Sequence, residues 1–170
     1  MPHTEPGPCV SHEVFAPPRD RGIESVGVPR EVELRELPAA TSFTVLVPEH
    51  PPFPLESVAL HPSDRRFGVS EQVHIGYASD FFGEEDRQFW LVESADRFPE
   101  RRAVKWSEAG SLRFGEDHDI DPPLRLVQLQ RLGTQVELPS YHLDVDELLH
   151  LARALVPLPG GPPILIPPAP

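Results

Sequence analysis

Apolar residues recur along this chain with two different periods, and the longest stretch with the helical period lies near the C-terminus. Between residues 143 and 157 the apolar positions have the 3.6-residue spacing of one helix face: Val145, Leu148, Leu149, Ala152, Leu155 and Val156. Asp144 and Glu147 have the spacing of a capping box, and Pro157 disfavours helix at the residue before it. The pattern therefore predicts an amphipathic helix that begins after Asp144 and ends near Val156.

Most other apolar residues alternate with polar ones at period two, which is typical of half-buried β-strands. We expect strands at residues 31–36, 43–47, 57–61, 72–77, 88–92, 102–106, 111–114, 124–129 and 135–138. Residues 88–92 are apolar on both faces, which predicts a central strand. Residues 102–106 and 111–114 flank Gly110 as in a hairpin, and the alternation slips near Val127, which indicates a bulge.

These elements predict the fold class. Connections this short favour antiparallel pairing, because parallel crossovers need a dozen or more residues. A helix of about a dozen residues is marginal in water, so its apolar stripe has to be buried on the strands. We therefore expect an α+β, mostly β fold: a twisted or curved antiparallel sheet with one C-terminal amphipathic helix packed on it. The pattern leaves the strand order open.

Proline divides the chain into three parts. Its 170 residues suffice for one domain, and most of the 23 prolines lie in the first thirty residues, residues 48–54 and the last fourteen residues. We expect a flexible Pro-rich head at residues 1–30, a single domain at 31–157, and a Pro-rich extended tail at 158–170.

Charge and cysteine content narrow the classes of partner. A formal net charge of −12 argues against nucleic-acid binding, which needs clustered Lys and Arg. Cys9 is the only cysteine, so no disulfide forms within the chain. The sequence contains neither an apolar run of transmembrane length nor a recognisable signal peptide, which predicts a cytoplasmic protein. A leader already removed from the sequence would leave the same pattern.

Two sets of residues are candidates for chemistry. The aromatic residues Tyr77, Trp90 and Trp106 fall on expected strands, where they are core residues or, in a curved sheet, line an apolar ligand cavity. The acidic loop 116–121 offers Asp117, His118, Asp119 and Asp121 as metal ligands; the alternative is a solvated acidic turn, since their spacing does not match a calcium loop. We find no nucleophile motif and no phosphate-binding loop, so no catalytic residue and no cofactor are predicted.

Several stretches together resemble a known group of domains. These are residues 43–48, 73–77, 89–92, 133–138 and 144–155. They resemble bacterial domains of unknown function found in lipoproteins and in the outer parts of anti-sigma factors. The resemblance implies a lipoprotein-carrier-like fold, in which a curved antiparallel sheet wraps over helices, and a binding, sensing or structural role. It supplies no catalytic residues. Members of the group usually carry a leader or membrane anchor, and this sequence shows neither.

Three hypotheses about function follow. The first is a non-enzymatic domain that binds a protein partner or a small apolar ligand on its curved sheet. The second is a metal-assisted hydrolase that uses the acidic loop 116–121. The third is a component of a larger assembly that makes its contacts through the Pro-rich ends. The sequence does not determine the oligomeric state.

Overall fold

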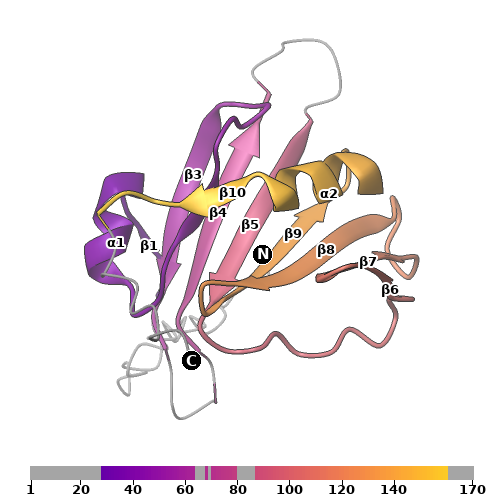
Figure 1. The fold of residues 1–170 in the computed structure, drawn as a ribbon, viewed down its shortest axis with the longest axis horizontal. Coiled ribbons are helices and arrows are strands. Elements are labelled where there is room, and N and C mark those ends of the chain that lie inside the picture. Colours follow the sequence, from indigo (N-terminus) through magenta and orange to yellow (C-terminus); the bar gives the residue numbers. More distant parts are fainter. Residues whose placement is uncertain (1–27, 64–67, 69, 80–86, 161–170) are drawn as a thin grey trace, which may run out of the picture.

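An eight-stranded antiparallel sheet is the frame of the fold in the computed structural model, which describes residues 28–63, 68, 70–79 and 87–160. Its strands follow the order β1-β3-β4-β5-β9-β8-β7-β6. They are β1 (Arg30–Glu31), β3 (Leu55–His61), β4 (Gln72–Ala78), β5 (Gln88–Ser94), β6 (Ser107–Ala109), β7 (Leu112–Asp117), β8 (Leu124–Arg131) and β9 (Thr134–Ser140). Strand direction turns steadily from β3 to β7, so the sheet is strongly twisted (Figure 1). The predicted fold class is confirmed.

The sheet consists of two meanders joined in its middle. Strands β3, β4 and β5 form one meander, and β6, β7, β8 and β9 form the other. The two meet where β5 pairs with β9, with Val92 opposite Glu137 and Ser94 opposite Gln135. The predicted central position of the strand at residues 88–92 is therefore confirmed.

Helix α2 (Val145–Arg153) lies across one face of this sheet and packs against β7 and β8 (Figure 1). Asp144 and Glu147 form the predicted capping box, each side chain accepting from the other residue's backbone amide. The helix nevertheless ends at Arg153, earlier than the predicted end near Val156. Leu155–Pro157 forms strand β10, so here strand pairing competes successfully with the continued helical pattern.

Strand β10 pairs with β2 (Leu46–Pro48) in a separate two-stranded sheet above the same face. The predicted strand at residues 43–47 thus exists only in part, and it does not join the large sheet. Glu93 of β5 ties the two sheets together, because both its carboxylate oxygens lie 3.1 Å from the amide nitrogen of Leu46. The amide of Leu158 donates to the carbonyl of Val45 at 2.8 Å, which extends the pairing by one more contact.

Two hydrophobic clusters lie on opposite faces of the sheet. The main core fills the space under α2, β2 and β10, and a smaller cluster on the other face contains Val104, Leu124 and Leu126. Leu126 and Val127 are both fully buried, one in each cluster, and the pairing of β8 continues through them without a register shift. The predicted bulge near Val127 is therefore wrong, because the broken alternation reflects burial on both faces.

Two further predictions about the strands need correction. Residues 31–36 were expected as a strand, yet the strand here (β1) is only Arg30–Glu31, and a 3-10 helix (η1, Leu34–Glu36) leads into α1 (Leu37–Ala40). Glu33 and Glu36 form a reciprocal capping box there, and Pro38 lies in the first turn of α1, where its missing amide costs nothing. The expected hairpin 102–106 with 111–114 is instead β6 with β7, and Val104 makes only an isolated bridge to Asp117.

The described residues contain no helix long and apolar enough to cross a membrane. The expected head and tail lie outside the described residues, except for residues 28–30 and 158–160.

Candidate functional site

A groove beside α2 is the candidate site, and we call it the α2 groove. It encloses about 490 Å³ and opens between the helix, the chain before β3 and the start of β5. The residues that line it are His50, Pro52, Phe53, Arg87, Leu143, Asp146, Glu147, His150 and Leu151. Its floor is apolar and its rim carries charged and imidazole side chains, a combination typical of binding sites in which a few polar groups orient the occupant.

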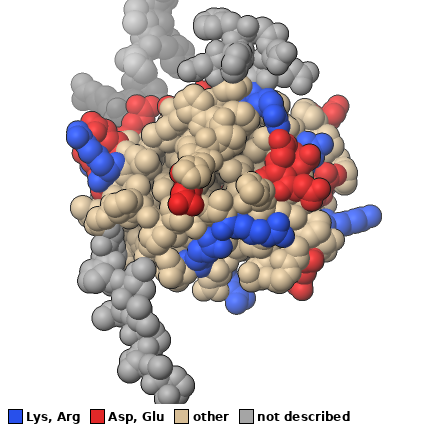
Figure 2. Space-filling model, turned by 45° about the horizontal axis from the view of Figure 1, so that its top comes forward, with Lys and Arg blue, Asp and Glu red and all other residues tan. Residues whose placement is uncertain are grey.

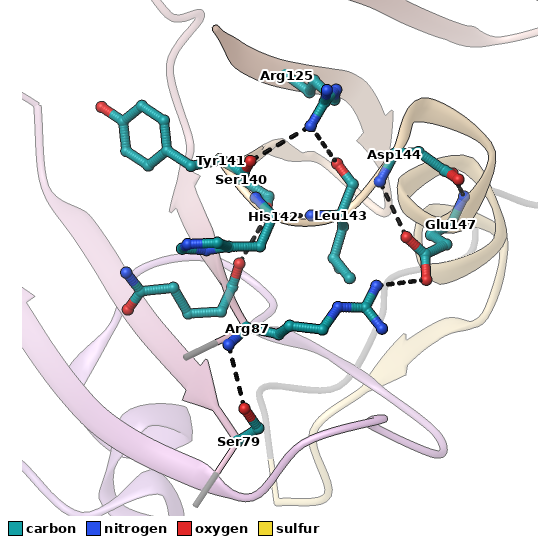
Figure 3. A network of polar contacts seen from close by, with 10 residues as sticks. Ser79, Arg87, Arg125, Ser140, Tyr141, His142, Leu143, Asp144 and Glu147 are labelled. Atoms are coloured by element: carbon teal, nitrogen blue, oxygen red, sulfur yellow. Dashed lines mark hydrogen bonds and ion pairs between the residues drawn. The ribbon is translucent and has the colours of Figure 1, made fainter. Parts of the chain in front are cut away.

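A short polar network fixes the start of α2, which forms one wall of the groove (Figure 3). The hydroxyl of Ser140 accepts from the amides of His142 and Leu143 at 3.1 and 3.0 Å and donates to the carbonyl of Gln88 at 2.6 Å. Arg125 donates to the carbonyl oxygens of Tyr141 and Leu143. The turn between β9 and α2 is thereby held to both neighbouring strands, so this wall is positioned before any occupant arrives.

Arg87 connects the two sides of the groove. Its guanidinium lies 2.7 Å from a carboxylate oxygen of Glu147 and 5.6 Å from the ring centroid of Phe53. The second distance is within the range of a cation–π contact. The backbone amide of Arg87 donates to the hydroxyl of Ser79 at 3.1 Å (Figure 3). Phe53 in turn packs against Phe89 of the main core, with ring centroids 6.1 Å apart, so the groove floor is continuous with the core.

Acidic side chains gather at the first turn of α2. On the face of the molecule that Figure 2 draws, one group of acidic side chains lies beside a basic one. Asp144 caps the helix by accepting from the amide of Glu147 at 2.8 Å, and Glu147 is paired with Arg87. Asp146 is exposed and makes no ion pair with any residue that the structure describes. Asp146 is therefore the rim carboxylate that no described residue neutralises.

The three aromatic residues predicted as ligand contacts do not come together. Tyr77 is 3% exposed and stacks on Phe89 inside the main core, where burial and the nearby Glu93 raise its pKa to about 12. Trp90 lies on the opposite face of the sheet from Tyr77, edge-on to Tyr141 at 6.4 Å. Trp106 precedes β6 and is covered by the guanidinium of Arg113 at 4.7 Å. The main core fills the face of the sheet under α2. Because Tyr77 and Trp90 lie on opposite faces of the sheet, the three side chains do not line one cavity.

The acidic loop does not assemble a metal site. Within the described residues, which include all of 116–121, no three His, Cys, Asp or Glu side chains are placed to hold a metal ion. Asp117 is buried and accepts from the backbone amide of Asp119 at 3.1 Å, while His118 faces Glu116 at 3.4 Å. Asp121 is exposed and precedes Pro122. Local turn contacts thus account for Asp117 and His118, while Asp119 and Asp121 are exposed.

The opposite face of the sheet carries a polar cluster around the buried carboxylate of Glu137. Glu137 is 3% exposed, and its carboxylate accepts from Arg101 at 2.6 Å and from the side-chain Nε2 of Gln128 at 2.7 Å. The His74 ring stacks on His61 with centroids 4.0 Å apart. Burial and the neighbouring His61 lower the pKa of His74 to about 4, with Glu137 acting in the opposite direction. His74 is therefore neutral near pH 7 and suited to packing.

Sequence reasoning missed the residues that build the α2 groove. Residues 50–54 lie in the stretch 48–54 where prolines crowd, and no pattern in the sequence singled out Arg87 or His150. The signal that the sequence did offer was Phe53. A lone aromatic side chain among prolines is apolar and gains nothing from exposure to water. The segment around Phe53, the start of β5 at Arg87 and helix α2 meet only through long-range packing. Arg87 and Glu147, for example, are 60 residues apart in sequence.

Comparison with known proteins gave no match for this chain. No family model matches the chain, and searches of curated proteins and of solved structures gave no significant match. The resemblance to lipoprotein and anti-sigma-factor domains therefore stays a prediction.

Proposed function

We propose that this chain is a non-enzymatic domain that binds a protein partner through the α2 groove. The observation that carries the proposal is an apolar floor, made by Phe53, Leu143 and Leu151, beside a rim whose polar groups are already fixed. The floor belongs to the main core, so it does not need to rearrange before binding. Such preorganisation reduces the ordering cost of association.

A protein segment fits this groove better than a small apolar ligand. Small apolar ligands favour enclosed pockets that bury most of their surface, whereas this groove is open along the side of α2. Three charged side chains, Arg87, Asp146 and Glu147, also line it. A peptide can satisfy such charges with its own polar groups, and a purely apolar molecule would leave them desolvated.

The metal-assisted hydrolase has no comparable support, because no three possible ligand side chains come together among the described residues, which include the whole acidic loop. An assembly role for the Pro-rich ends concerns residues outside the described part of the chain.

Site-specific photo-crosslinking tests the proposal. A benzoyl-phenylalanine is placed at His150, which is exposed on the groove rim, and at Gln130, which is exposed on the opposite face of the sheet. Both full-length proteins are irradiated in lysate, and adducts are identified by mass spectrometry. We expect a discrete protein adduct from position 150 whose purified form binds the unmodified chain. Absence of that adduct, or an identical adduct from position 130, would overturn the proposal.

A further inference from the structure

We infer that the α2 groove takes a short extended segment of its partner, with a bulky apolar side chain next to a Lys or Arg. This inference rests on the proposed function and adds the chemistry of the partner. It is carried by the apolar floor, the length of the helix wall and the balance of charge at the rim.

The size of the groove sets the length of the segment. The wall on the α2 side runs from Leu143, the residue before the N-cap, to Leu151 of the helix. At about 1.5 Å per helical residue that wall is roughly 12 Å long, which about four residues of an extended chain would span. The floor is made by Phe53, Leu143 and Leu151, so the buried part of the occupant is an apolar side chain.

The sign of the charge follows from counting the groups at the start of α2. Three carboxylates, on Asp144, Asp146 and Glu147, are opposed by the guanidinium of Arg87. The amino end of the helix contributes about half a positive charge. The net charge at the start of α2 therefore stays negative by more than one unit. Asp146 is exposed in the groove lining with no ion-pair partner among the residues described, so it is the carboxylate that a Lys or Arg would reach.

The whole chain favours the same partner. Its net charge of −12 attracts cationic segments over long distances and repels acidic ones. Long-range attraction raises the association rate, while contact with the apolar floor sets the dissociation rate. A segment that carries a basic and an apolar side chain associates faster and dissociates more slowly, whereas an acidic apolar segment would be repelled from the rim.

A peptide-display selection identifies the chemistry directly. Random twelve-residue peptides are selected on the immobilised full chain, and enriched sequences are synthesised with a fluorophore. Crosslinking from position 150, compared with position 130, shows which peptides occupy the groove. Affinities are then measured by fluorescence polarisation for the natural chain, for Asp146→Asn and for Glu108→Gln, an exposed acid on β6 outside the groove.

We expect groove-bound peptides to pair a Leu, Ile, Phe or Trp with an adjacent Lys or Arg. Asp146→Asn should weaken them about two- to fivefold, as expected for an exposed ion pair, and Glu108→Gln should leave them unchanged. Groove-bound peptides without a basic residue, or an affinity equal in Asp146→Asn, would overturn this inference and leave the proposed function standing. Failure of every peptide to crosslink from position 150 of the folded chain would overturn both.

Discussion

The buried carboxyl of Glu93 should make the stability of this domain fall with rising pH, and Glu93→Gln should remove that dependence. The side chain is 0% exposed beneath β2, and its carboxyl oxygens accept only from the amide of Leu46 among the described residues. Burial raises the pKa of Glu93 to about 8, and the hydrogen bond from Leu46 acts in the opposite direction. Glutamine keeps the shape and one accepting oxygen, but it cannot ionise.

The sign and size follow from linkage. In the unfolded chain the Glu93 carboxyl titrates near its ordinary pKa of 4.5. Because the folded-state pKa is higher, folding binds a proton between these two values. The stability contributed by protonated Glu93 is complete below about pH 4.5 and is lost as the pH rises to about 8. At about 1.4 kcal/mol per pH unit, the total loss is on the order of 5 kcal/mol.

Urea unfolding followed by tryptophan fluorescence measures this loss. The free energy of unfolding is determined at pH values from 4 to 9 for the natural chain and for Glu93→Gln, and the difference is plotted against pH. Taking the difference cancels the titration of all other groups. The variant should gain relative stability steadily from about pH 4.5 to 8, and Glu108→Gln, at an exposed site, should show no such slope. A difference for Glu93→Gln that is flat across this window would refute the reasoning.

Three further substitutions test the contacts that hold the fold. Asp144→Ala removes the side-chain cap of α2 and should lower the free energy of unfolding by about 1 kcal/mol in urea titration; an unchanged midpoint would contradict the cap. Gly115→Ala places a Cβ 2.5 Å from a methyl of Val104 and 2.7 Å from a backbone carbonyl oxygen. This substitution should lower the free energy of unfolding by about 1–3 kcal/mol, as measured by thermal unfolding. A neutral result would show that the atoms around Gly115 can shift to make room for the methyl group. Arg101→Met removes the cation that pairs with the buried Glu137. Because Arg101 is 41% exposed, we expect the free energy of unfolding in urea to fall by only about 1–2 kcal/mol. An unchanged free energy would show that the ion pair is dispensable for stability.

The sequence by itself determined the elements whose signals are local. The capping box of α2 needs only residues three apart, and the strands at 72–77, 88–92 and 135–138 carry clear alternation. These signals were enough to predict a mostly β fold with one covering helix. The local signals failed where two compete, as at residues 31–36, where a capping box and Pro38 favour helix over the alternating pattern.

Only the tertiary structure decided how the elements combine. The end of α2 depends on β2, which lies about a hundred residues earlier and pairs with Leu155–Pro157. The unbroken strand through Val127 depends on a second cluster on the other face of the sheet. The α2 groove joins Phe53, Arg87 and Glu147 from three distant parts of the chain. No periodicity records such contacts, because they arise from the packing of the sheet as a whole.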